Sequence, residues 1–163
     1  MQRTIARRLA KFRARLRRLK SDAALITDTV NVRYLSGFTG DGSALLITQS
    51  DAIFITDFRY IEQANAECLG YHVLRRRDGT AKVVAREARK LGVSILGIEQ
   101  NVLTLETADI LKEELRNLPP VNAGMEGYRR DRVAAGRAPT GLVLGDITAL
   151  LRTRDAAARP ADC

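Results

Sequence analysis

The chain has 163 residues, of which 45% are hydrophobic and 28% are charged, a length and composition typical of one globular domain with or without a tail. Its two cysteines, Cys68 and Cys163, lie far apart and its only histidine is His72, which excludes a disulfide framework and a histidine-rich zinc site and indicates a reducing, cytoplasmic compartment. The formal net charge of +8 makes anionic partners worth testing, and no apolar run reaches the roughly 20 residues of a membrane span.

The positive charge is concentrated in residues 1–20, which hold nine basic side chains and no acidic one. Apolar residues recur in this segment at helical spacings, namely Ile5, Leu9, Phe12, Leu16 and Leu19. This pattern predicts an amphipathic helix, and we favour one that docks its apolar stripe on the rest of the domain. The alternatives are an arm that binds phosphate or a membrane surface, and a mitochondrial presequence.

Strand and helix patterns alternate through the rest of the domain. The predicted strands are 23–27, 43–48, 52–56, 71–76 and 94–98. The predicted helices are 30–36, 59–68, 80–91 and 104–118. The second and third strands are separated by a tight turn and form a predicted hairpin. Short apolar strands flanked by helices indicate an α/β fold, with a mixed, mostly parallel sheet and helices on both faces.

The composition changes near the end of the chain. Residues 124–163 are rich in alanine, glycine and arginine, and we interpret them as a divergent tail with at most one helix, over 147–159. The domain itself is assigned to residues 1–123.

Three acidic residues follow predicted strands: Asp28, Asp57 and Glu99. Ligands gather at the carboxyl ends of strands in open α/β sheets, so the three carboxylates would suit two divalent metals and phosphodiester cleavage. The alternative, which we favour, is that they cap helices or accept hydrogen bonds from loop amides.

The segment Asp57-Phe58-Arg59-Tyr60 is the best surface candidate for binding. Arg59 offers a planar fork to a carboxylate, and Tyr60 offers an amphipathic contact area. The alternative is a local pair between Asp57 and Arg59, with Tyr60 packed at a helix start.

Other candidates have simpler interpretations. His72 has no metal-ligating neighbour in register, and Cys68 falls among apolar residues of a helix. The glycine-rich segment 37–42 precedes a strand, whereas a phosphate-binding loop follows one, so we expect a tight connection there.

Five segments occur in an order that resembles a known family. They are Asp22-Ala-Ala-Leu-Ile-Thr, Asn31-Val-Arg-Tyr-Leu-Ser-Gly-Phe-Thr-Gly40, Ala44-Leu-Leu-Ile-Thr48, Thr56-Asp-Phe-Arg-Tyr60 and Leu96-Gly-Ile-Glu99. Together they resemble the N-terminal, creatinase-type domain of Xaa-Pro aminopeptidases and prolidases, over about residues 7–123. The resemblance implies a ribonuclease H-like α/β layered fold.

The resemblance also carries functional expectations. In that family this domain cuts no bonds; it packs on a C-terminal pita-bread domain, takes part in subunit contacts and lends residues to the active-site rim. The rim or subunit interface would here include Arg59 and Tyr60. The family's catalytic domain binds two divalent metals through two Asp, one His and two Glu, a pattern that this sequence lacks.

We therefore hypothesise a truncated relative without the dimetal catalytic domain, and expect no catalytic residue, metal or cofactor in this chain. The expected partners are proteins, either a second copy of the chain or a catalytic domain. The alternative is a ribonuclease H-like, metal-dependent nuclease, or a nucleic-acid-binding module that uses the basic N-terminal helix.

Overall fold

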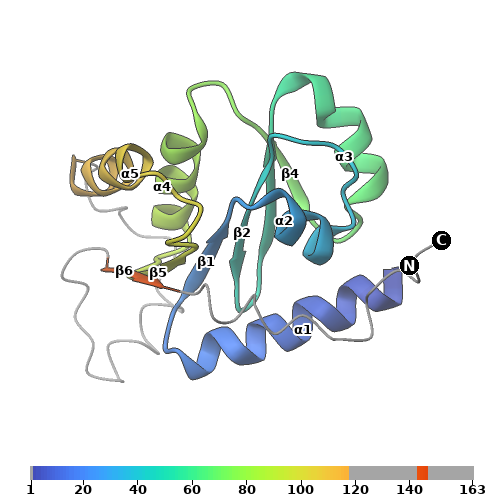
Figure 1. Cartoon of the computed structure of the whole chain (residues 1–163), viewed down its shortest axis with the longest axis horizontal. Helices are drawn as coiled ribbons and strands as arrows, with labels where there is room; N and C mark the ends of the chain where they lie inside the picture. Colours follow the sequence, from blue (N-terminus) through green and yellow to red (C-terminus); the bar gives the residue numbers. More distant parts are fainter. Residues whose placement is uncertain (1, 118–142, 147–163) are drawn as a thin grey trace.

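A six-stranded sheet forms the centre of the molecule, and helices cover both of its faces (Figure 1). The computed structural model describes residues 2–117 and 143–146. The strands are β1 (Ala23–Ile26), β2 (Ala44–Thr48), β3 (Ala52–Thr56), β4 (His72–Arg75), β5 (Ile95–Ile98) and β6 (Val143–Asp146). The helices are α1 (Gln2–Arg18), α2 (Thr29–Ser36), α3 (Ile61–Glu67), α4 (Thr80–Lys90) and α5 (Leu105–Asn117), with a 3₁₀ turn η1 (Phe58–Tyr60).

The strand order is β4-β3-β2-β1-β5-β6. β2 is antiparallel to β1 and to β3, whereas the other neighbouring pairs are parallel. The mixed, mostly parallel sheet and the β2–β3 hairpin are thus confirmed. Because β2 alone runs in the opposite direction, the other strands all end at one edge of the sheet, which we call the carboxyl edge.

Successive strand residues point to opposite faces, and both faces are buried. Ile26, Leu45 and Phe54 lie in one core with side chains from α1, α2 and α3. Leu25 and Leu46 lie in a second core with side chains from α4 and α5. This two-sided burial explains why the strands read as continuous apolar runs rather than as alternating ones.

The basic helix α1 is docked on the domain. Phe12 and Leu16 are buried in the first core. Two arginines of α1 also donate hydrogen bonds to backbone carbonyls: Arg8 Nη1 to Tyr34 at 3.0 Å and Arg13 Nε to Thr48 at 2.9 Å. The structure therefore has the docked helix that we favoured from the sequence.

Leu19 is an exception within the predicted apolar stripe. It follows the last residue of α1 and its side chain is 47% exposed. The helical spacing continues past the point at which the helix ends, so the position of Leu19 in the stripe was predicted wrongly.

The strand β6 was not predicted. It lies within residues 124–163, which we assigned to a divergent tail, and it pairs in parallel with β5 from Ile95↔Val143 to Ile98↔Asp146. The expected helix over 147–159 lies outside the described residues. Within the described part of the chain, no helix combines the length and apolar character needed to cross a bilayer.

Because α1 is docked on the domain, alanine substitutions at Phe12 and at Leu19 should have very different effects on stability. Phe12→Ala should lower the free energy of unfolding by about 3 kcal/mol, because it leaves a cavity in the core. Leu19→Ala should change it by less than about 0.5 kcal/mol, because that side chain is half exposed. Urea denaturation of both variants would measure this, and an unchanged Phe12→Ala variant would contradict the docked helix.

Candidate functional site

Glu99 is a buried carboxylate that holds two segments together. It follows β5, is 1% exposed, and accepts hydrogen bonds from the backbone N–H groups of Thr27 (2.6 Å) and Asp28 (2.9 Å). Its other oxygen accepts one from the side-chain amide of Asn31 at 2.6 Å. The carboxylate therefore ties the end of β5 to the connection between β1 and α2.

Asp28 and Asp57 each cap a helix start. The Asp28 carboxylate accepts the backbone N–H of Asn31 at 2.9 Å at the start of α2. The Asp57 carboxylate accepts the backbone N–H of Arg59 at 2.9 Å at the start of η1. Both follow the capping interpretation made from the sequence.

The three acids do not form a metal site in the described residues. No group of three or more His, Cys, Asp or Glu within residues 2–117 and 143–146 is arranged to hold a metal ion. Each carboxylate is engaged with protein donors instead. The geometry thus does not favour the two-metal nuclease that we considered as an alternative.

The segment Asp57-Phe58-Arg59-Tyr60, which we call the β3 corner, is held by a bidentate ion pair. Arg59 donates to Asp57 from Nε (3.1 Å) and Nη2 (2.7 Å), and Arg76 Nη2 lies 3.6 Å from the same carboxylate. The Asp57 side chain is only 14% exposed, whereas that of Arg59 is 63% exposed. The carboxylate therefore orients a guanidinium whose remaining surface faces solvent.

The ion pair lowers the pKa of Asp57 below its ordinary value. The largest cause is the hydrogen bond from the Arg59 side chain, which outweighs partial desolvation; the Arg59 backbone N–H and the charges of Arg59 and Arg76 add to it. The same pairing raises the pKa of Arg59.

Tyr60 anchors the β3 corner to the core. Its ring meets that of Phe38 edge to face at 5.8 Å, and Phe38 in turn packs against Phe54 at 4.8 Å. A Cβ at Gly40 would lie 2.6 Å from Phe38 and 3.2 Å from Tyr60, so a side chain at this position would displace the rings. Segment 37–42 is therefore the tight connection that we expected. The structure brings Arg59 and Tyr60 together, with the Arg59 guanidinium carbon 5.4 Å from the Tyr60 ring centre.

Four exposed apolar side chains lie in the segments that follow strands at the carboxyl edge. Val30, Phe58, Val102 and Leu105 come two to seven residues after the ends of β1, β3 and β5, and their exposed fractions are 54%, 67%, 37% and 85%. We call these four residues the carboxyl-edge patch. The sequence analysis missed it, because Val30 and Leu105 fall within the predicted helices, where an apolar residue is expected to face the core.

The remaining candidates do not form a site. His72 is exposed on β4. Cys68 is 2% exposed, and burial raises the pKa of its thiol to about 11, so it is not a reactive thiolate at neutral pH.

Comparison with known proteins identifies the family to which this domain is similar. The Creatinase/Prolidase N-terminal domain family matches residues 8–130. The chain belongs to this family. The uncharacterized peptidase YqhT of Bacillus subtilis (strain 168) is 38% identical over 100 residues, which are 61% of this chain and 28% of that protein.

Solved structures of the family have the same fold. The N-terminal domain of cytoplasmic peptidase PepQ from Mycobacterium tuberculosis H37Rv matches with 29% identity and a TM-score of 0.71, over 90% of this chain and 96% of that one. The Xaa-Pro dipeptidase from Bacillus anthracis matches with 25% identity and a TM-score of 0.70, over 90% of this chain and 34% of that one. The creatinase-type chain thus spans about a third or less of these two Bacillus peptidases.

Replacing Arg59 should raise the pKa of Asp57. In Arg59→Ala the carboxyl loses its strongest partner but keeps Arg76, so its pKa should move part of the way back toward that of a free aspartate. Carbon-detected NMR titration of the Asp57 carboxyl would measure the change. Arg33→Ala, which removes an arginine that does not contact Asp57, is the matched control.

The contribution of the Asp57–Arg59 ion pair to the stability of the fold should depend on pH. A carboxyl with a lowered pKa in the folded state stabilises the fold above the pKa it has when unfolded, and this contribution is lost as the pH falls through the folded value. The difference in stability between wild type and Arg59→Ala should therefore shrink in acid. An equal difference at all pH values would contradict a role for the ion pair.

Proposed function

We propose that this creatinase-type domain is the non-catalytic partner of a pita-bread peptidase domain. It would pack on that domain, take part in subunit contacts, and supply Arg59 and Tyr60 to the rim of the active site. Membership of the family and the similarity to proteins described as an Xaa-Pro dipeptidase and a cytoplasmic peptidase support this function.

The observation that carries the proposal is the carboxyl-edge patch. Phe58 follows β3 and Leu105 follows β5, and these two strands lie three strand spacings, or about 14 Å, apart in the sheet. Large apolar side chains exposed along one edge, with the charged Arg59 next to Phe58, are typical of an interface with an apolar centre and a polar rim. We infer that a catalytic domain covers this edge.

The β3 corner is suited to a rim position. Asp57 fixes one side of the Arg59 fork, so little conformational entropy remains to be lost when the exposed side meets a carboxylate. The carboxylate could belong to a peptide substrate or to the partner domain. Tyr60, anchored by its contact with Phe38, would add a rigid amphipathic surface next to it.

Hydrolysis itself is assigned to the partner. The described residues offer no cluster of metal ligands and no activated nucleophile. We expect this chain to need neither a metal nor another cofactor in order to fold.

A peptidase assay tests whether this chain by itself is non-catalytic. The purified chain, incubated with Xaa-Pro dipeptides and Mn²⁺, should release no N-terminal residue, while the Bacillus anthracis dipeptidase serves as the positive control. Turnover that follows this chain through purification would overturn the proposal.

A second experiment tests the carboxyl-edge patch. Left uncovered, the patch should make the chain self-associate, with a mass that rises with concentration in sedimentation experiments. Phe58→Asp and Leu105→Asp should each weaken this association about tenfold or more, because they place a charge at the centre of an apolar contact.

Leu69→Asp is the matched control for those variants. Leu69 is 54% exposed but lies shortly before β4 begins, at the opposite edge of the sheet. An equal effect of Leu69→Asp, or a wild-type monomer at all concentrations, would contradict an interface at the carboxyl edge.

A further inference from the structure

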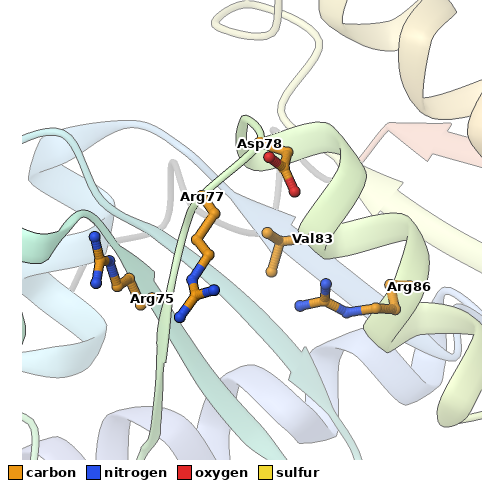
Figure 2. A pocket seen from close by; sticks show the side chains of 5 residues that line it. All are labelled: Arg75, Arg77, Asp78, Val83 and Arg86. Atoms are coloured by element: carbon orange, nitrogen blue, oxygen red, sulfur yellow. The ribbon is translucent and has the colours of Figure 1, made fainter.

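We propose that the hollow between β4 and α4 binds a phosphate group. The hollow has a volume of about 270 Å³. Five residues line it: Arg75, Arg77, Asp78, Val83 and Arg86. Figure 2 shows Arg86 reaching from α4 toward Arg77, with Val83 between them; Arg75 lies on the other side of Arg77, and its guanidinium points away from the other two arginines. This inference is independent of the peptidase-related function.

The hollow is lined mainly by positive charge. Three arginines and one carboxylate, that of Asp78, line it, and Arg86 is also paired with Glu87, so an excess of positive charge remains for an anion. Arginine suits this ligand because its planar fork can donate two parallel hydrogen bonds to phosphate oxygens.

The guanidinium groups retain donors for a ligand. Within the described part of the chain, no hydrogen bond or ion pair involves Arg77, and Arg75 lies over the Phe58 ring at 5.7 Å. Arg86 Nε donates to Glu87 at 3.1 Å, which uses one of the five N–H donors of that side chain.

The backbone that carries these arginines is held in place. Between Arg75 and Arg77, the backbone N–H of Arg76 donates to the Thr56 carbonyl at 2.6 Å. The Arg76 side chain donates to Thr80 Oγ1 at 2.9 Å and pairs with Asp57. The loop is thus fixed on both sides, so little of its conformational freedom is lost when a ligand binds.

The start of α4 adds to the positive potential. Gly79 occupies the N-cap with φ of 89° and has no side chain to accept the N–H groups of the first turn. Asp78, the residue before it, and Val83 line the hollow, so the positive end of this 11-residue helix lies beside the arginines.

The arrangement of the donors favours phosphate over a carboxylate. Arginines from two elements surround a tetrahedral anion better than a planar carboxylate, which a single fork satisfies. The phosphate could be free or the end group of a phosphomonoester.

Titration of the full chain separates these ligands. Inorganic phosphate, phenyl phosphate and benzoate would be added at constant ionic strength while the amide NMR signals of residues 77–83 are followed. The phosphates should bind saturably, with dissociation constants on the order of 1 mM, and benzoate at least about tenfold more weakly. Tighter binding of phenyl phosphate would identify a phosphomonoester site, and tighter binding of inorganic phosphate a free-phosphate site.

Variants test whether the hollow is responsible. Arg77→Ala should weaken phosphate binding roughly fivefold, the loss of one partly exposed charged contact, without changing the melting temperature. Arg86→Gln should act in the same direction. Arg18→Ala removes the same charge shortly before β1 begins, at the opposite edge of the sheet, and should leave binding unchanged.

Three outcomes would overturn the proposal. They are no saturable phosphate binding, benzoate binding as tight as that of phenyl phosphate, and an equal loss in Arg18→Ala and Arg77→Ala. The last would mean that the net charge of the chain, rather than the hollow, attracts the anion.

Discussion

The buried carboxylate of Glu99 sets the geometry of the carboxyl edge. Two backbone N–H groups after β1 and the amide of Asn31 donate to it. Each of these donors, if buried without a partner, would cost about 1–3 kcal/mol. One side chain directly after β5 therefore fixes the point at which the chain leaves β1 and enters α2, and so the position of Val30. Among the described residues, no buried side-chain polar atom lacks a partner, so this arrangement is satisfied rather than strained.

Most strands, the β2–β3 hairpin and the helix caps could be predicted from the sequence, because the interactions that form them are local or follow the hydrophobic pattern. Apolar runs buried on two faces predicted the strands, and a short polar turn predicted the β2–β3 hairpin. Asp28 and Asp57 cap helices that begin within a few residues, so capping was a local inference. The role of Glu99 was foreseen only in kind, as an acceptor of loop amides, because its donors lie about 70 positions away in the chain.

Features that depend on long-range contacts could not be predicted in this way. The strand β6 has four residues, one of them glycine, and its pairing with β5 spans a long connection. The hollow between β4 and α4 joins Arg86 to Arg75 and Arg77 across a turn and the start of a helix. On a helical pattern Arg86 is simply a residue of the exposed face, and only the approach of α4 to β4 gives it charged neighbours.

The β3 corner and the arginine hollow are linked through Arg75 and Arg76, and this has a consequence for both proposals. Arg75 contacts Phe58 of the carboxyl-edge patch and also lines the hollow, while Arg76 pairs with Asp57 and holds Thr80 at the start of α4. A domain that covered Phe58 would therefore change the surroundings of Arg75, and a bound phosphate would draw Arg75 away from the ring. Of the three consecutive arginines, Arg77 alone lines the hollow without a described contact to the β3 corner. A change there separates anion binding from docking, whereas a change at Arg75 affects both.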